Sequence, residues 1–244
     1  MRNIITIFKR EMGAYFATPL AYIFIVIFLA MAASFTFFMG AFLERDQADL
    51  NSFFQFHPWL YIVLIPAISM RLWSEEMQTG TIELLLTLPI TLTEAILAKF
   101  LAAWAFIAVA LSLTFPIWIS VNYLGDPDNG VILAGYIGSL LMAGGFLAIG
   151  SFVSAMTKNQ VIAFIISTAA CFVFTASGSP LVLAFFSGWA PDIILSFISN
   201  LSFLTHFQDI MKGVVDLRDI IYFTTLIMLF LFANKLAIRR AKDA

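Results

Sequence analysis

The chain has 244 residues, of which 61% are hydrophobic and only 11% are charged, and its net charge is −2. An ordinary soluble domain has about 25% charged residues, so this composition excludes a soluble globular protein and indicates a membrane protein. The slightly acidic balance argues against nucleic-acid binding, which needs a basic surface. The apolar runs are long and continuous rather than short and alternating. The expected fold class is therefore an all-α membrane protein, with residues 1–244 as a single transmembrane domain.

Residues 2–17 are predicted to form an amphipathic helix in the membrane interface. Apolar side chains recur at every fourth position of this segment, and polar side chains occupy the opposite face. The apolar set is Ile4, Phe8, Met12 and Phe16, and the polar set is Thr6, Lys9, Arg10 and Glu11. Such a helix acts as a membrane anchor or as an elbow that transmits force to the first span, and the same residues suit both roles.

Six segments are apolar and long enough to cross about 30 Å of hydrocarbon, which takes about 20 residues in a helix. They are residues 19–43, 57–73, 94–123, 131–156, 160–177 and 219–237. A seventh apolar stretch, 181–204, contains Gly188, Pro191 and Asp192, which interrupt a helix or a span.

The distribution of basic residues decides how the seventh stretch is assigned. With six crossings both termini share one side, and that side collects ten of the thirteen basic residues. These are Arg2, Lys9, Arg10, Arg71, Lys99, Lys158, Lys235, Arg239, Arg240 and Lys242. The positive-inside rule therefore places both termini in the cytoplasm. A seventh crossing would put the basic C-terminal tail outside, so residues 178–218 are predicted to form an outer re-entrant hairpin and loop between spans five and six.

Small residues recur along the predicted fourth span. Ala134 and Gly138 form one pair at small-xxx-small spacing, and Gly144 and Ala148 form another. This spacing lets helices approach closely, so we expect tight packing within the chain, with a pore-lining or dimer-forming role as the alternative.

Ionisable side chains, which intramembrane catalysis and ion coupling need, are nearly missing from the predicted spans. No Asp, Glu, Lys, Arg or His occurs in the ranges 100–125, 129–157, 161–191 and 220–234. This argues against ion-coupled pumps and metal-dependent intramembrane enzymes, and we predict no catalytic, cofactor-binding or metal-binding residue. There is also no G-x-x-x-x-G-K-[ST] motif, so this chain is not expected to hydrolyse ATP by a P-loop.

Two weaker alternatives involve histidine. His57 and His206 are both expected near the outer surface in structural roles, and haem ligation by the pair is the alternative. Ser179 with His206 as a base resembles a nucleophile and its partner, but a helix break at residues 178–180 explains Ser179 more simply.

The connection 74–93 is predicted to be cytoplasmic and concentrates charge, glycine and proline. Gly80 is expected to end the second helix, and Thr81 to start a short helix that Pro89 stops. Thr91 and Glu94 stand at capping-box spacing for the third span. These signals predict a short, rigid amphipathic helix between the second and third spans. Such a helix is suited to binding a partner, and the alternative is that it lies flat on the lipid.

The outer segment 205–219 is the best candidate for an extracytoplasmic contact. The residues proposed for it are His206, Asp209, Asp216 and Arg218. The alternative is a surface helix that ends at Gly213, followed by an acidic cap for the last span.

Motifs along nearly the whole chain resemble those of ABC-2 type permeases, the membrane subunits of ABC transporters. They are F-K-R-E at 8–11 with T-P-L-A-Y at 18–22, E-x-x-x-G-T-x-E-L-L-L-x-x-P at 76–89, and G-V-V-D-L-R-D-I-I-Y-F at 213–223. The last motif is most similar to the gliding-motility-associated GldF-type permease branch.

This resemblance implies a permease with six spans in a bacterial inner membrane, paired with a second copy or a homologous permease above two copies of a P-loop ATPase subunit. Export or mechanical work across the membrane would follow ATP hydrolysis, and an ATPase-independent channel or membrane scaffold is the alternative. A partner with a large extracytoplasmic domain is also implied. In this family the N-terminal helix and the first cytoplasmic loop face the ATPase. The resemblance therefore implies a set of residues that couple the ATPase to the permease. They are Lys9, Arg10, Glu11, Glu75, Glu76, Gly80, Thr81, Glu83, Leu85 and Pro89.

Overall fold

The structure is a computed structural model that describes the backbone of residues 2–87, 89–188 and 190–243, and their side chains except those of residues 2, 85, 86 and 241–243. All regular elements within these ranges are helices. Five helical segments there are long and apolar enough to cross a membrane, and a sixth is added if one bent pair of helices counts as a single span. The all-α prediction is therefore confirmed.

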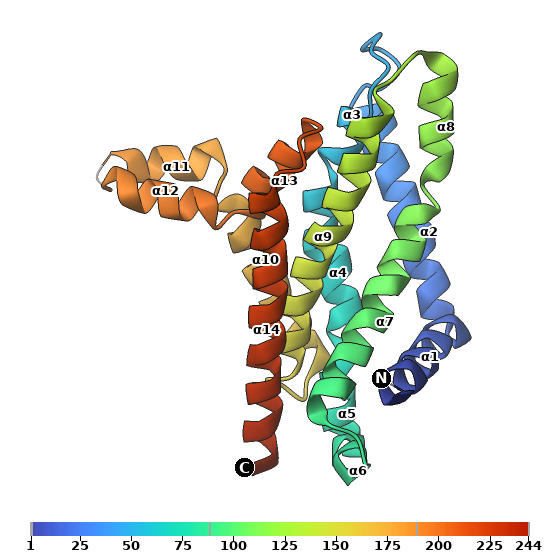
Figure 1. Cartoon of the computed structure of the whole chain (residues 1–244), viewed down its shortest axis with the longest axis vertical. Coiled ribbons are helices and arrows are strands. Elements are labelled where there is room, and N and C mark those ends of the chain that lie inside the picture. Colours follow the sequence, from blue (N-terminus) through green and yellow to red (C-terminus); the bar gives the residue numbers. More distant parts are fainter. Residues whose placement is uncertain (1, 88, 189, 244) are drawn as a thin grey trace.

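The five segments and the bent pair follow the predicted spans in chain order. They are α2 (Pro19–Ser34) with the π-helix η1 (Phe35–Met39); α3 (Asn51–Phe54), α4 (His57–Ser69) and α5 (Arg71–Thr79) in succession; α7 (Leu92–Ser112) with α8 (Phe115–Leu124); α9 (Asn129–Ser154); α10 (Gln160–Ala176) with α11 (Pro180–Ser187); and α14 (Leu217–Asp243). Both chain termini lie at the same end of this bundle (Figure 1). At that end α1 (Arg2–Ala17) packs against α7, and α6 (Thr81–Thr87) projects below the bundle.

The central helix is α9, which contacts α4, α5, α7, α10, α13 (Phe203–Met211) and α14. Its glycines make these approaches close. A Cβ atom added at Gly138 would lie 2.7 Å from Ile210 Cγ2, and one added at Gly150 would lie 1.9 Å from Ser69 Oγ. The expected tight packing of the fourth span within the chain is therefore confirmed.

Two of the predicted spans contain helix breaks. The second span is interrupted at Met70, after which α5 continues to Thr79, so residues 74–79 of the predicted connection are helical. The third span is interrupted at residues 113–114, and Pro116 stands in the first turn of α8. Proline has no backbone N–H to continue the hydrogen bonds of α7, and at the break Thr114 Oγ1 donates a 2.6 Å hydrogen bond to the Leu111 carbonyl.

After α10 the chain leaves the bundle (Figure 1). It turns by 71° from α10 into α11, and α11 and α12 (Asp192–Asn200) lie side by side and project sideways (Figure 1). Ser179 Oγ accepts the N–H of Val182 and so caps α11, which gives this serine a structural role. Insertion of this hairpin into the membrane stays a prediction.

We expect Gly150→Ala to destabilise the protein, because the added methyl group overlaps Ser69 of α4. Overpacking of this kind costs about 1–3 kcal/mol. Denaturant titration in detergent, followed by tryptophan fluorescence, measures the effect. Gly13→Ala is the matched control, because no other part of the described chain lies within 4 Å of a Cβ added there. Equal stability of Gly150→Ala and the unmodified chain would contradict the tight contact between α4 and α9.

Candidate functional site

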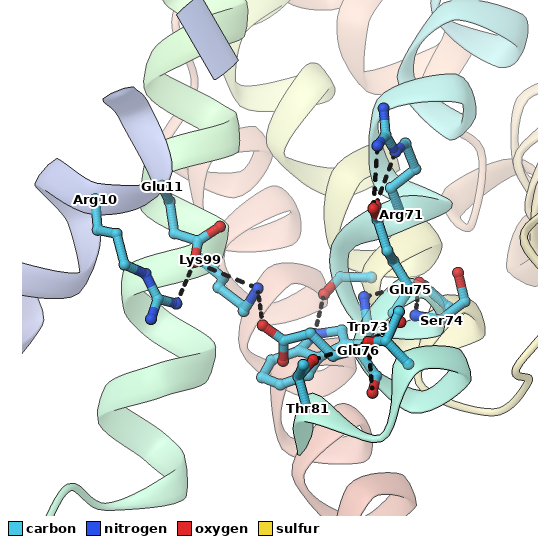
Figure 2. Close-up of polar contacts among 12 residues, drawn as sticks. Arg10, Glu11, Arg71, Trp73, Ser74, Glu75, Glu76, Thr81 and Lys99 are labelled. Carbon is cyan, nitrogen blue, oxygen red and sulfur yellow. Dashed lines mark hydrogen bonds and ion pairs between the residues drawn. The ribbon is translucent and has the colours of Figure 1, made fainter. Parts of the chain in front are cut away.

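The end of the bundle that carries both termini contains a buried cation, Lys99 of α7. Its side chain is only 5% exposed. Its Nζ atom lies 2.8 Å from Glu76 Oε1 of α5, 3.5 Å from Glu11 Oε1 of α1, and 5.3 Å from the centre of the Trp73 ring. Such partners are needed because removing a charge from water costs several kcal/mol. One ammonium group therefore joins three helices that are separate in the sequence (Figure 2).

Two further ion pairs lie on α5 and α1. Arg71 donates to both carboxylate oxygens of Glu75, at 2.9 and 3.2 Å, one helical turn away. Arg10 Nη2 lies 2.6 Å from Glu11 Oε1, the atom that also faces Lys99. These outer pairs are partly exposed and contribute less to stability than the Lys99 contacts.

The start of α5 is capped by Ser154 of α9. The Ser154 hydroxyl accepts the backbone N–H groups of Trp73 and Ser74, both at 3.1 Å, and donates to the Met70 carbonyl at 2.8 Å. The first N–H groups of a helix have no acceptor within the helix, so an outside acceptor is required when they are buried. Ser154 thus accounts for the break at Met70 and attaches α5 to α9.

Ser151, one turn earlier on α9, extends these contacts to the last span. Trp73 Nε1 donates to Ser151 Oγ at 3.2 Å, and Asn234 Nδ2 of α14 donates to the same oxygen at 2.7 Å. All three side chains are buried. A continuous set of polar contacts therefore runs from α1 through α7, α5 and α9 to α14.

Aromatic packing holds α1 on α7 beside the Lys99 cluster. The rings of Tyr15 and Phe106 stack with centroids 5.1 Å apart. Desolvation of the Tyr15 hydroxyl, with a smaller contribution from the Glu11 carboxylate, raises the pKa of Tyr15 above its ordinary value. The phenol therefore stays neutral at physiological pH and adds no charge to the cluster.

The turn between α5 and α6 is built around Gly80, whose φ of 74° is left-handed. This conformation favours glycine, and the predicted C-cap is confirmed. The hydroxyl oxygens of Thr79 and Thr81 lie 3.0 Å apart across the turn. On α6 the side chains of Glu83 and Leu84 are exposed, Leu84 by 67%.

The chain returns to the bundle through the predicted capping box. Thr91 Oγ1 accepts the N–H of Glu94 at 3.2 Å, and Glu94 Oε2 accepts the N–H of Thr91 at 2.8 Å. The capping-box prediction is confirmed. The left-handed turn at Gly80 therefore precedes α6, and the capping box at Thr91 starts α7.

The structure brings together only part of the predicted coupling set. Glu11 and Glu76 meet at Lys99 and Arg10 pairs with Glu11, whereas Glu75 pairs with Arg71 (Figure 2). The other described members lie exposed at the surface, and they are Lys9, Gly80, Thr81, Glu83 and Pro89. The side chain of Leu85 lies outside the described part of the chain.

At the opposite end of the bundle, His206 of α13 joins the outer hairpin to the last span. His206 Nδ1 lies 2.6 Å from Asp219 Oδ1, and Nε2 lies 3.0 Å from the Asn200 carbonyl oxygen. Because a carbonyl oxygen only accepts, Nε2 carries a hydrogen. Arg218 also donates to the Asn200 side chain at 2.5 Å, and the Tyr222 ring stacks on His206 with centroids 3.9 Å apart. The end of α12 is therefore attached to the start of α14.

The predicted extracytoplasmic residues differ in exposure. His206 is only 4% exposed, whereas Asp209, Asp216 and Arg218 are exposed. His57 is also fully buried and bonded to Ser139, Nδ1 to Oγ at 2.7 Å, so both histidines are buried within the protein. In the described residues no three His, Cys, Asp or Glu side chains are placed to hold a metal ion.

Lys99, Ser151 and Ser154 were not among the predicted site residues. Lys99 entered the sequence analysis only as one of the basic residues that set orientation. A stronger signal was present, because a lysine inside a predicted span is costly and indicates a partner. The two serines gave no such signal, since serine is common in membrane helices and packs without a charged partner.

Comparison with known protein families identifies a match over most of the chain. The family model described as ABC-2 family transporter protein matches residues 6–233. This range includes the Lys99 cluster, α6 and the His206 cluster. A search of the curated proteins gave no match.

We expect Lys99→Met to lower stability by about 3 kcal/mol, because Glu11 and Glu76 then lie near each other without a cation. Lys212→Met is the matched control, since Lys212 pairs with Asp209 in a salt bridge whose side chains are 72% and 53% exposed. Exposed pairs contribute about 0–1 kcal/mol. Denaturant titration of both variants in detergent provides the comparison, and equal losses would contradict a structural role for the buried lysine.

Proposed function

The chain belongs to the ABC-2 family of transporter proteins, and on this premise we propose that it is the permease subunit of an ABC transporter driven by a separate P-loop ATPase. Two ATPase copies would dock beneath two permease chains, the second being a further copy or a homologous permease. Within the family we assign the chain to the gliding-motility-associated GldF-type branch, on the resemblance of residues 213–223. We place it in a bacterial inner membrane with both termini in the cytoplasm.

The observation that carries this proposal is the exposed helix α6. It projects at the end where both termini lie (Figure 1), between the left-handed turn at Gly80 and the capping box at Thr91. Glu83 and Leu84 face outward on it. A short helix with exposed apolar and acidic side chains suits a protein partner better than solvent.

The contacts above α6 supply a route by which a push on it would reach the spans. α5 ends directly at α6, and α5 is bonded to Lys99 of α7 through Glu76 and to Ser154 of α9 through its first turn. Closure of the ATPase dimer would therefore move α5 and, with it, α1, α7 and α9. Such coupling requires that α6 fits one ATPase state better than the other. The work done would be export of a substrate or transmission of force across the membrane.

An extracytoplasmic partner would meet the surface formed by Asp209, Asp216 and Arg218. These three residues are exposed beside the hairpin. Because His206 is buried against Asp219, it would act by holding the hairpin in place rather than by touching the partner.

We expect Glu83→Lys to reduce the amount of P-loop ATPase that co-purifies with the chain in mild detergent by about tenfold, because a charge reversal at a contact costs more than 1 kcal/mol. Quantitative mass spectrometry of the purified complex measures this ratio. Glu44→Lys, an equal charge reversal on an exposed residue of the loop after η1, is the matched control.

Two outcomes of this experiment would contradict the proposal in different ways. Unchanged ATPase recovery with Glu83→Lys would show that α6 is not the docking surface. Absence of any P-loop ATPase from the unmodified complex would instead favour an ATPase-independent channel or membrane scaffold.

A further inference from the structure

The last helix, α14, has one face that the rest of the described chain leaves uncovered. Its apolar side chains Met228, Phe232 and Leu236 are 66%, 60% and 42% exposed. Because these residues recur at every fourth position, they form one stripe along the helix. α14 runs from one end of the bundle to the other (Figure 1). An apolar stripe of this kind on a membrane span is suited to contact with acyl chains.

A basic cluster continues the same face at the end of the bundle that carries the termini. It consists of Lys235, which is half-buried, and of Arg239 and Arg240, which are exposed. Arg239 follows Phe232 by two helical turns, so it stands directly below the apolar stripe. The chain thus places cations and apolar side chains in line on one helix face.

The rotation of α14 that presents this face outward is fixed from its other side. Asn234 and Ile238 are both buried. Asn234 Nδ2 donates a 2.7 Å hydrogen bond to Ser151 of α9, which holds that side of the helix against the bundle. Arg239 therefore has no freedom to turn inward without breaking a buried contact.

The length of α14 places the basic cluster at the level of lipid headgroups. The helix has 27 residues, and no charged residue occurs between positions 220 and 234. Arg218 is exposed at the far end, and Arg239 lies about 32 Å from it along the helix axis. This distance matches the roughly 30 Å of membrane hydrocarbon. Lys235 lies one turn deeper, and its long side chain can extend to the same level.

The three cations have no acidic partner. Within the described part of the chain, none of their side chains forms an ion pair or a hydrogen bond. Other cations of this protein are paired with carboxylates, and these are Arg10, Arg71, Lys99 and Lys212. Basic residues beside a membrane attract anionic lipids. The basic cluster therefore lacks a counter-charge at the depth where lipid phosphates lie.

We propose that this face of α14 binds one anionic phospholipid, of the phosphatidylglycerol type, in the leaflet on the side of the termini. Its phosphate accepts from Lys235 and Arg239, Arg240 adds a third positive charge, and one acyl chain runs along Phe232 and Met228. A choline headgroup carries its own cation, which the cluster repels. A soluble acidic protein would reach Arg239 and Arg240 but not the apolar stripe inside the membrane, so the stripe favours a lipid.

This inference requires that α14 spans the membrane, but it does not depend on an ATPase partner or on transport. The experiment uses the full chain, stripped of lipid in detergent and then equilibrated with mixed micelles of one phospholipid at a time. Phosphatidylglycerol and phosphatidylcholine with identical acyl chains are compared. Native mass spectrometry counts the lipid molecules that each chain retains.

We expect one tightly retained phosphatidylglycerol per chain, with about tenfold preference over phosphatidylcholine. Each cation near an anionic surface contributes about fivefold, and salt screens part of this gain. Added salt should therefore lower the preference. Soluble glycerol phosphate, which has no acyl chain, should not displace the lipid.

Two double variants test whether the basic cluster produces the preference. Arg239→Gln with Arg240→Gln should remove most of it, and Arg239→Lys with Arg240→Lys, which keeps both charges, should preserve it. Lys9→Gln with Lys158→Gln is the matched control. These two lysines are also exposed and free of ion pairs within the described chain, but neither belongs to α14.

Four results would overturn the proposal. The first is equal retention of the two lipids by the unmodified chain, which would leave the cluster free for an acidic protein. The second is a preference that survives the change of both arginines to glutamine. The third is an equal loss in the lysine control, which would indicate attraction by the overall charge. Displacement of the lipid by glycerol phosphate is the fourth, because it would indicate a site for free phosphate.

Discussion

The Lys99 ammonium group carries a full charge at a position where its side chain is only 5% exposed, and the surrounding helices are arranged to compensate it. Glu76 and Glu11 provide the compensation from α5 and α1. Separating either helix from α7 would leave an unpaired charge in a medium of low polarity, which is strongly unfavourable. This one requirement fixes where the N-terminal helix lies and how α5 approaches the bundle.

The other buried polar groups also need hydrogen-bond partners, and these partners come from neighbouring helices. Ser154 satisfies the first turn of α5, and Ser151 joins Trp73 to Asn234 of α14. Because uncharged hydrogen bonds between membrane helices contribute only about 0.6 kcal/mol each, these serines orient helices more than they stabilise them. The close approaches of the α9 glycines supply the packing that these hydrogen bonds need. α9 is therefore the element to which α5 and α14 are attached.

Glu76 connects the Lys99 cluster with the proposed coupling route. One of its oxygens binds Lys99, and the other faces no protein donor in the described chain. At the other end of the bundle, His206 fixes the hairpin to α14 by a separate buried pair.

The sequence by itself determined the membrane class, the approximate spans, the Gly80 cap, the Thr91–Glu94 capping box and the close packing of the fourth span. Each of these depends on apolar content or on residues a few positions apart, so the pattern is visible locally. The tertiary structure decided that Lys99 meets Glu11 and Glu76, that Ser154 caps a helix 81 residues earlier, and that His206 and His57 point inward. Those contacts join side chains that no spacing rule relates, because only helix packing brings them within hydrogen-bonding distance.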